Sequence, residues 1–538
     1  MKTITKHTIL ALLATTAMFA SCYEDKGNYT YTETEEITGD GFPDQISVVQ
    51  KSDYIELNPT FTSSQNGTID NNPNYEFGCL LWKSGGTFED TRTRQKDINE
   101  EHAKDIKYFA DLDQGDYVIQ YMVTNKSTGV TTNFKVPVKV TSATYEGWMV
   151  LCDDKDGNAR LDLVSRISPT RINVVTNLLG SKDPKLKGAR SMYMDAYPFN
   201  YYGRNGLWYC TEHGTYTLNE TKLTSQYNIT SEFMVAPENE EVVELNGLSM
   251  GKMFAITDKG NIYVKSSKSG ARYEDACNTF TDGGNPEFHA APFVGVSAQR
   301  PADYLANKVL FYDMDNKQFV VLDGSDNGKS SMCSTLDDPS DKLFSYRTGR
   351  DLITMVNTTF SGSTVYSVLQ DDAKQRYVYG INLSSGQITQ TMYEPLTAAT
   401  GVDKATSFAF HSQYPYMFYN DGDKVYSYHL INHAANLALT LPGEEVTMLK
   451  FNLFLHPTTM LSDKSEEFAA QQYQLIVGSY KTSSTDGNGG VLRFYKFDQA
   501  TGTLTLDKEY EGFARIKNVM YREPVSYTHL TLPTKRIV

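Results

Sequence analysis

One unit recurs along most of this chain, between residue 147 and about residue 523. An apolar strand runs into a turn of Gly, Asp or Asn, and a second strand rich in Tyr, Phe and Val follows it. We count seven such hairpins, whose centres lie about 45–65 residues apart, and this interval fits the ~40–50 residues of a β-propeller blade with added loops. The repeats share no common motif, so six and eight blades stay open, and seven is our prediction. The hairpins pair residues 148–152 with 160–164, 207–210 with 215–218, 253–257 with 261–264, 309–312 with 318–322, 365–369 with 377–381, 416–419 with 424–428, and 474–480 with 491–497.

Residues 46–142 carry a different strand pattern, which predicts a separate domain. Apolar and polar residues alternate most clearly in residues 115–124, which a turn at 125–129 joins to a strand at 133–140. A length near ~100 residues, a central Trp82 and a closing hairpin are typical of an immunoglobulin-like β-sandwich. The predicted fold class is therefore all-β, with this sandwich followed by a β-propeller-like domain over residues 145–523. The 36 Tyr and 26 Phe suit such a fold, because aromatic side chains fit half-buried pleated surfaces.

The N-terminus has the three parts of a secretory signal. Lys2 and Lys6 supply the positive end, a short apolar run follows, and small residues precede Cys22. The run is shorter than the ~20 residues of a spanning helix, so residues 1–21 are expected to be a cleaved signal peptide. The sequence Phe-Ala-Ser-Cys at residues 19–22 resembles a lipobox, which predicts a lipid on Cys22. The polar residues 22–45 are expected to form the lipidated end and a tether.

Charge and hydropathy exclude some partners. The formal net charge of −15 argues against nucleic acid, which selects for basic surfaces. A second long apolar stretch is absent from the sequence, so the lipid is the expected membrane anchor. Residues 524–538 look like a translated sequencing-adapter end, and we leave them out of the fold prediction as a non-native tail.

Motifs for catalysis and for cofactors are not found in the sequence, so we predict neither catalytic residues nor a cofactor. There is no His-Glu-x-x-His and no phosphate-binding glycine loop. His429 and His433 have the spacing of one helix face but lie among strand-like residues, so we expect loop histidines. The other five cysteines lie far apart without metal-ligand spacing, and we expect buried small hydrophobic residues in preference to disulfides. They are Cys79, Cys152, Cys210, Cys277 and Cys333.

One acidic turn is a weak calcium candidate. Asp154, Asp156 and Asn158 present alternate oxygens near a glycine, as a calcium loop does. The distal glutamate of an EF-hand is missing, and tight turns favour Asp, Asn and Gly for conformational reasons alone. We expect a turn here and predict no metal site.

The best candidate for ligand binding is an aromatic segment around residue 200. Exposed aromatic rings can stack on sugars or peptide side chains, while a neighbouring charge fixes orientation. The alternative is an aromatic strand packed in the core. The candidate residues are Tyr197, Tyr201, Tyr202, Arg204 and Trp208.

Residues 22–29 read CYEDKGNY, and this string at a lipidation site resembles the mature N-terminus of PKD-like family lipoproteins of Bacteroidetes. The likeness continues through the hairpin at 115–140 into residues 145–151, and we expect it to cover most of the chain. The resemblance implies an accessory outer-membrane lipoprotein of a Sus-type uptake system, with a TonB-dependent transporter and a SusD-like lipoprotein as partners. Glu24 and Asp25 resemble the signal that exports such lipoproteins to the cell surface, although a merely solvated tether would look the same.

Three functions remain open from the sequence. The first is a non-catalytic binding or scaffold subunit for a glycan or peptide nutrient, with amides and aromatic rings on one rim of the propeller. The second is a propeller-fold hydrolase or lyase acting on glycans or peptides, with two or more ionisable groups converging in the central pocket. The third is a purely structural partner of the transporter, with a broad apolar patch and no pocket for a small ligand.

Overall fold

The structure is a computed structural model that describes most, but not all, of the chain. It describes residues 35–50, 52–84, 95–168, 170–179, 184–196, 205–219, 222–248, 251–266, 271–280, 287–298, 308–325, 332–384, 387–454 and 465–523. Cys22, the signal peptide, Glu24, Asp25 and the tail at 524–538 lie outside these residues. No helix among the described residues is long and apolar enough to cross a membrane.

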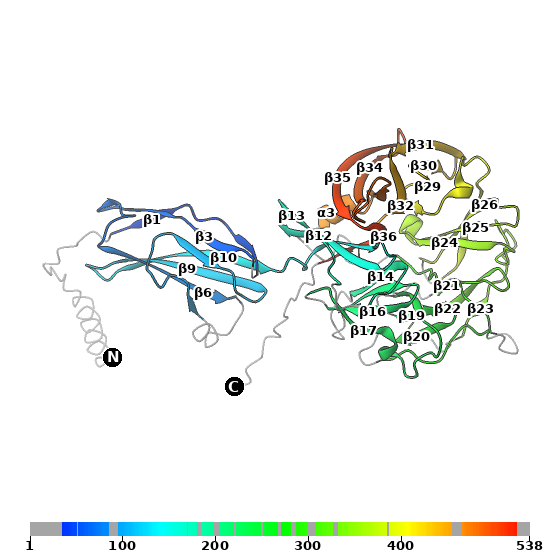
Figure 1. Ribbon diagram of the computed structural model, residues 1–538, viewed down its shortest axis with the longest axis horizontal. Helices are drawn as coiled ribbons and strands as arrows, with labels where there is room; N and C mark the ends of the chain where they lie inside the picture. The colour runs from blue at the N-terminus through cyan, green and yellow to red at the C-terminus, as the bar shows by residue number, and fades with distance from the viewer. Residues whose placement is uncertain are drawn as a thin grey trace, which may run out of the picture. The chain divides into compact units, whose positions relative to one another are not determined.

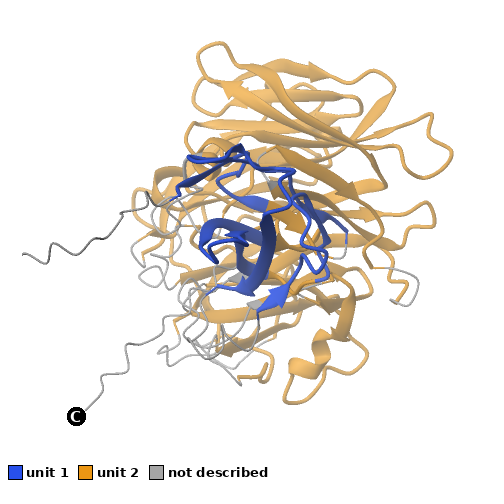
Figure 2. Ribbon diagram, turned by 90° about the vertical axis from the view of Figure 1, so that its left-hand side faces the viewer, with its two compact units in different colours: residues 1–46, 51–111, 115–139 blue, residues 47–50, 112–114, 140–538 orange. Residues whose placement is uncertain are grey.

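The chain divides into two compact units (Figure 2). One comprises residues 1–46, 51–111 and 115–139, and the other comprises residues 47–50, 112–114 and 140–538. Strands dominate both units, as the sequence predicts.

The strands between residues 37 and 141 form a β-sandwich. Its largest sheet has the order β2–β10–β9–β6–β7, and smaller sheets join β1 to β4 and β5, and β3 to β8. The alternation seen in the sequence holds, because every second residue of β6 and β9 is buried. The strands are β1 (Ile37–Asp40), β2 (Ile46–Val49), β3 (Tyr54–Leu57), β4 (Thr60–Ser63), β5 (Gly67–Thr68), β6 (Tyr75–Lys83), β7 (Lys96–Asp97), β8 (Ile106–Phe109), β9 (Gly115–Asn125) and β10 (Thr131–Thr141).

The segment expected to be a tether is shorter than predicted. Residues 22–45 include β1, which pairs antiparallel with β4, and Ile37 on this strand is buried. A strand of four residues with one buried side chain is too short to show a period-two pattern in the sequence.

The C-terminal unit is a β-propeller, and the described residues form seven sheets in it (Figure 1). Every one of the seven predicted hairpins is present as an antiparallel pair of strands. The prediction of seven blades is therefore confirmed. In chain order the sheets are β36–β11–β12–β13, β14–β15–β16–β17, β18–β19–β20, β21–β22–β23, β24–β25–β26–β27, β28–β29–β30–β31 and β32–β33–β34–β35.

The bounds of the strands in the first four blades are β11 (Gly147–Asp153), β12 (Ala159–Ser168), β13 (Arg171–Val175), β14 (Ala189–Ala196), β15 (Asn205–Thr211), β16 (Gly214–Leu218), β17 (Ser225–Asn228), β18 (Val242–Gly247), β19 (Lys252–Thr257), β20 (Ile262–Ser266), β21 (Lys308–Asp313), β22 (Gln318–Asp323) and β23 (Ser334–Thr335). The remaining strands are β24 (Asp351–Asn357), β25 (Thr364–Gln370), β26 (Arg376–Asn382), β27 (Thr389–Pro395), β28 (Phe408–Phe410), β29 (Tyr416–Asp421), β30 (Lys424–His429), β31 (Ala434–Thr440), β32 (Glu444–Lys450), β33 (Leu475–Lys481), β34 (Gly490–Asp498), β35 (Thr503–Phe513) and β36 (Arg515–Arg522). Helices are short: η1 (Ile229–Glu232), η3 (Phe360–Gly362), η5 (Val402–Lys404) and α3 (Ser465–Gln471).

The last strand closes the ring. β36 pairs antiparallel with β11, from Gly147 opposite Arg522 to Asp153 opposite Arg515. The first blade therefore takes its inner strand from the C-terminal end of the described chain. In the fourth blade, isolated bridges from Ala290 and Gly295 to β21 place an irregular segment in the inner position.

The hydrophobic core lies between the blades. Seven buried clusters each combine strands of two neighbouring blades, so that every junction of the ring has its own cluster. One cluster packs Trp148 of the first blade against Phe494 of the seventh, with ring centroids 4.8 Å apart. The five cysteines are free and buried, as predicted.

Candidate functional site

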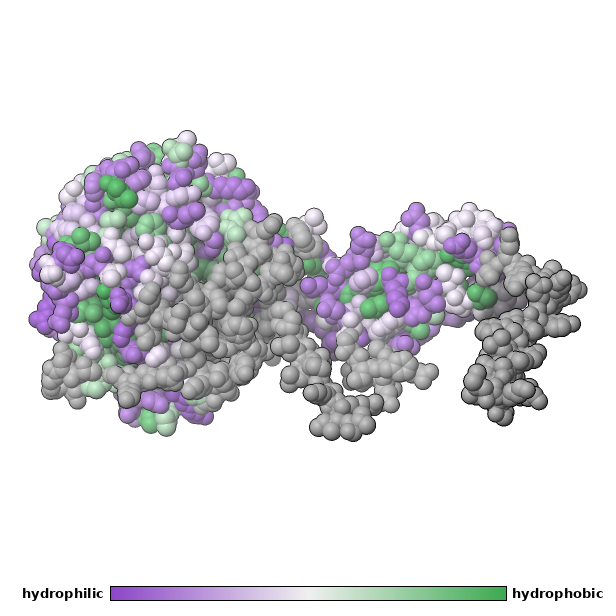
Figure 3. Space-filling view, turned by 180° about the vertical axis from the view of Figure 1, so that it is seen from behind, coloured by the Kyte–Doolittle hydropathy of each residue, from purple (hydrophilic) through white to green (hydrophobic). Residues whose placement is uncertain are grey.

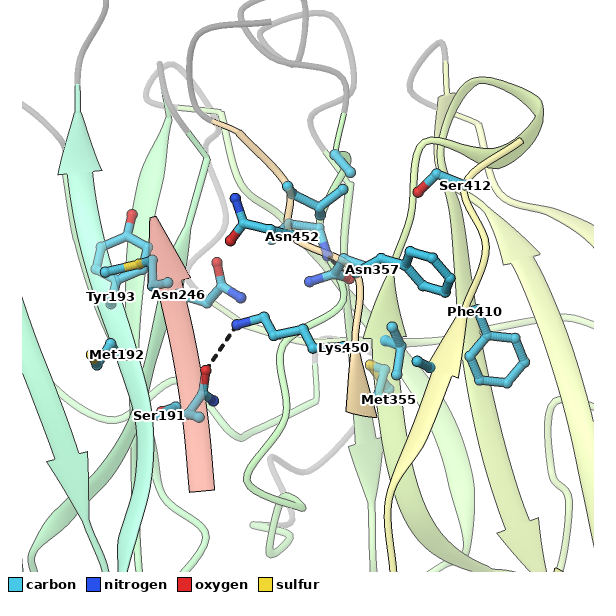
Figure 4. Close-up of a pocket in the computed structure, with 18 of the residues that line it drawn as sticks. Ser191, Met192, Tyr193, Asn246, Met355, Asn357, Phe410, Ser412, Lys450 and Asn452 are labelled. Atoms are coloured by element: carbon cyan, nitrogen blue, oxygen red, sulfur yellow. Dashed lines mark hydrogen bonds between the residues drawn. The ribbon is translucent and has the colours of Figure 1, made fainter. Parts of the chain in front are cut away.

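The inner strands of the seven blades surround a cavity of about 340 Å³ at the centre of the propeller (Figure 4). Its lining begins at Ser191 in β14, Glu244 in β18 and Asn518 in β36 and continues toward the C-terminal ends of these strands. Other lining residues follow the inner strands directly, such as Asn452 after β32. The cavity therefore occupies one half of the central channel, where the same ends of the inner strands meet.

Side chains on the inner strands bond neighbouring blades to one another. Lys450 of the seventh blade donates through Nζ to Asn518 Oδ1 at 2.8 Å and to the Val519 carbonyl oxygen at 2.7 Å, both in the first blade. Asn518 Nδ2 donates to the Arg190 carbonyl oxygen of the second blade at 3.1 Å. Separate sheets share no backbone ladder at these junctions, so the side chains supply the polar contacts.

The same kind of contact continues around the ring. Ser191 Oγ of the second blade donates to Glu244 Oε2 of the third at 2.8 Å. Asn357 of the fifth blade accepts from the Val296 N–H at 3.0 Å and donates to the Val294 carbonyl oxygen at 3.1 Å, both in the fourth. The other junctions use Lys252 Nζ to the Asp323 carbonyl oxygen, the Thr359 N–H to Ser412 Oγ, and the Leu449 N–H to Ser407 Oγ.

Two ionisable groups face the cavity with shifted pKa values. Burial raises the pKa of Glu244 to about 7, against the hydrogen bond from Ser191 and the charges of Arg190 and Lys450. Burial also lowers the pKa of Lys450 to about 8, against the charge of Glu244. No ion pair joins the two groups in the described part of the chain. Shifted groups of this kind in a cavity mark a candidate functional site.

The cavity wall is mixed in character. Amides and hydroxyls from several blades alternate with thioethers and aromatic rings. Figure 4 shows Asn246, Asn357, Asn452 and Ser412 above Lys450, with Met355 and Phe410 on one side. A pocket with apolar walls and a few placed polar groups is the usual form of a small-molecule site.

The aromatic segment predicted to bind ligand is only partly described. Tyr197, Tyr201, Tyr202 and Arg204 lie outside the described residues. Trp208 is among the described residues, and the prediction that it binds a ligand is wrong. Its side chain is 4% exposed in the cluster between the second and third blades, where it lies over Gly206 and beside Tyr193. The alternation of β15 directs this ring into the core, as the alternative reading expected.

The weak calcium candidate is a backbone turn. Asp154 Oδ1 accepts the N–H groups of Asp156 and Asn158, each at 2.8 Å, and the Asn158 amide also donates to Asp154. These oxygens are therefore used within the turn. No group of three acidic, His or Cys residues suited to a metal ion occurs among the described residues.

Sequence reasoning missed the residues of the channel. Glu244, Asn246, Lys450 and Asn452 each interrupt an apolar run, but a half-buried strand with one solvent face shows the same pattern. A search for charged residues beside apolar runs would have selected Glu244 and Lys450 among others.

Comparison with known proteins finds a family match in the N-terminal part of the chain. Residues 22–183 match the PKD-like family. The likeness expected to cover most of the chain is thus shown for this part, which holds the sandwich and the first strands of the propeller. No curated protein sequence matches the chain.

Several solved structures align with the chain at low identity. A quinonprotein alcohol dehydrogenase-like protein from Bacteroides thetaiotaomicron aligns over 91% of this chain and 100% of its own at 11% identity, with a TM-score of 0.40. The β-propeller domain of Cps50 (Swd1) from Myceliophteria thermophila aligns over 64% and 98% at 10% identity, with a TM-score of 0.35. YCF48 from Cyanidioschyzon merolae aligns over 65% and 98% at 10% identity, with a TM-score of 0.35. Such low identities carry no information on activity.

Proposed function

We propose that this chain is a lipid-anchored outer-membrane protein that binds a glycan or peptide nutrient in the central channel of its propeller without transforming it. It would serve a Sus-type uptake system, beside a TonB-dependent transporter and a SusD-like lipoprotein. The lipobox-like Cys22 and the acidic residues behind it support the location, and the match of residues 22–183 to the PKD-like family supports the pathway.

The observation that carries the binding function is the cavity formed by all seven inner strands. Its volume of about 340 Å³ falls in the range of small-molecule sites, ~300–1,000 Å³. Amides and hydroxyls on its wall suit a polar ligand. The cavity supports ligand binding. A purely structural partner of the transporter would instead be expected to have a broad apolar patch and no such pocket. On the face seen in Figure 3, apolar residues form small groups among polar ones.

A hydrolase or lyase is the second candidate, because Glu244 and Lys450 converge on the cavity with pKa values near neutrality. We favour binding for a geometric reason. A general base or acid works best without competing hydrogen bonds, but Glu244 already accepts from Ser191, and Lys450 already donates to Asn518 and Val519. Each group keeps one position for a ligand and is otherwise held in place. Both groups already serve the junctions between blades.

A screen of the full chain against host and dietary glycans and peptides separates the two candidates. Calorimetry reports binding, and mass spectrometry of the same mixtures reports products. Binding without product supports the proposal. Product formation that Glu244→Gln and Lys450→Met both abolish, while the melting curve stays cooperative, would replace it with the enzyme.

The location has its own test. Cys22→Ser removes the thiol that accepts the lipid, so the variant should move from the membrane fraction to the soluble fraction and lose labelling by a radioactive fatty acid. A wild-type chain that leaves the membrane in a salt wash would contradict the anchor.

A further inference from the structure

We propose that the ligand of the central channel is a neutral molecule rich in hydroxyl groups, the terminal residue of an uncharged glycan, held by Lys450, Glu244 and Asn452. This inference rests on the proposed function and names the ligand class for that same site. It follows from the polar groups that the junctions between blades leave free.

Asn452 is the first of these groups. Its side chain is 2% exposed, lines the cavity and makes no hydrogen bond to a described residue. Figure 4 shows its amide beside the cavity, above Lys450. The amide therefore offers both its donor and its acceptor to a ligand in the cavity.

Lys450 and Glu244 add one donor and one acceptor. The ammonium has three N–H groups, and two of them are used by Asn518 and Val519 within the described chain. Glu244 lines the cavity and accepts a hydrogen bond from Ser191 on Oε2, so Oε1 has no hydrogen-bond partner among the described residues. Asn246 uses its oxygen for the Gly247 N–H, so its amide nitrogen is a further donor.

A hydroxyl group matches this mixed set best, because it donates and accepts at once. One hydroxyl can accept from Lys450 and donate to Glu244, and a neighbouring hydroxyl can do the same with the two ends of the Asn452 amide. A carboxylate only accepts and would face the Glu244 oxygen, whereas an ammonium only donates and would face Lys450. The apolar C–H face of a sugar ring would lie against Met355 and Phe410.

Calorimetry on the full chain at pH 7.5 tests the ligand class with three panels. These are neutral oligosaccharides of glucose, galactose and mannose, oligosaccharides of uronic acids, and dipeptides. The key variant is Asn452→Leu, which keeps the size of the side chain and removes its polar atoms. The matched control is Asn436→Leu on the exposed strand β31, outside the cavity.

We expect a neutral oligosaccharide to bind, Asn452→Leu to weaken it at least tenfold and Asn436→Leu to leave it unchanged. The melting temperature of Asn452→Leu should be close to that of the wild type, since the change removes no hydrogen bond to a described residue. If uronic acids or dipeptides bind in a way that depends on Asn452, the ligand class is wrong while the proposed function stands. If a neutral sugar binds equally well to Asn452→Leu, the site is wrong. If no panel member binds, both proposals fail.

Discussion

Glu35, the first described residue, shows how one side chain can anchor an element. Its carboxylate accepts hydrogen bonds from Ser63, Tyr75, Asn66 and Asn125, the last at 2.6 Å. Burial raises the pKa of Glu35, but these four bonds outweigh it and hold the pKa at about 2. The carboxylate thus ties the start of β1 to three other parts of the sandwich.

The sandwich should therefore lose stability in acid. A carboxyl group with a pKa near 2 in the folded state, against 4.5 when unfolded, stabilises the fold above pH 4.5. This contribution, about 1 kcal/mol after solvent screening, should be lost as the pH falls from 4.5 toward 2. Urea unfolding of the full chain, with hydrogen exchange to identify the transition of the sandwich, measures it. Glu35→Gln should be less stable than the wild type at pH 7 and equal to it at pH 2. A constant difference across this range would contradict the assignment.

His411 in the propeller also has a lowered pKa, but there burial favours the neutral form of the side chain. Its ring is buried between Tyr414 and Tyr473, and Nδ1 accepts the backbone N–H groups of Gln413 and Tyr414. Burial lowers the pKa of His411 to about 4. The imidazole is therefore neutral in the folded protein at every pH above that value.

Stability of the propeller should fall between pH 6.5 and pH 4. In this window the unfolded chain binds a proton at His411 and the folded chain does not, so unfolding becomes more favourable as the pH drops, by about 3 kcal/mol in total. Thermal or urea unfolding at half-unit steps of pH measures the slope. His411→Asn cannot take up this proton, and its slope should be smaller. Parallel curves for the two proteins would show that other groups cause the pH dependence.

At the scale of elements, the paired middle strands of each blade were the easiest to predict. β19 and β25 are buried at nearly every position because neighbouring blades cover both of their faces, and this makes long apolar runs. The inner and outer strands have an open edge or an exposed face and show weaker patterns. β13, for example, exposes most of its residues. The hairpins were therefore visible in the sequence, and the strands that line the channel were not.

Gly147, at the start of β11, offers a test of how tightly these strands pack. Its φ of +141° disfavours other residues, and an added Cβ would lie 2.1 Å from the Val164 carbonyl oxygen. Gly147→Ala should lower the free energy of unfolding by more than about 2 kcal/mol, because backbone strain and a backbone clash act together. Gly157→Ala is the matched control, since its φ is +79° with no atom within 4 Å of the added Cβ. Equal losses in the two variants would mean that the clash relaxes.

At the scale of the whole molecule, ring closure depends on the two ends of the propeller sharing one sheet. β36 provides the inner edge of the first blade. Asn518 and Val519 on this strand accept hydrogen bonds from Lys450 of the seventh blade. Ile516 and Val519 also belong to the cluster between these two blades. The closing strand therefore holds backbone, polar and apolar contacts at once.

Removal of the closing strand should destabilise the propeller and make its unfolding less cooperative. A chain that ends before Arg515 loses the partner of β11 and leaves Lys450 without its acceptors, so its melting transition should broaden and shift to lower temperature by more than 10 °C. A chain that ends after Glu523 serves as the control and should melt like the full chain, as expected for a non-native tail. Circular dichroism of both truncated chains measures the difference. Similar melting of the two would show that the ring is stable without its closure.

The sequence by itself determined the all-β class, the seven hairpins and the burial of the cysteines, because alternation and apolar runs are local properties of a strand. Only the tertiary structure decided which side chains face the channel. Ser191, Glu244, Lys450 and Asn518 meet there although they lie in four different blades, since a ring brings the inner strands together whatever their distance along the chain. It also moved Trp208 from the predicted site into the core, because the direction of a side chain depends on which neighbouring blade covers its strand. Hydrophobic patterning specifies the blades, and closure of the ring creates the site.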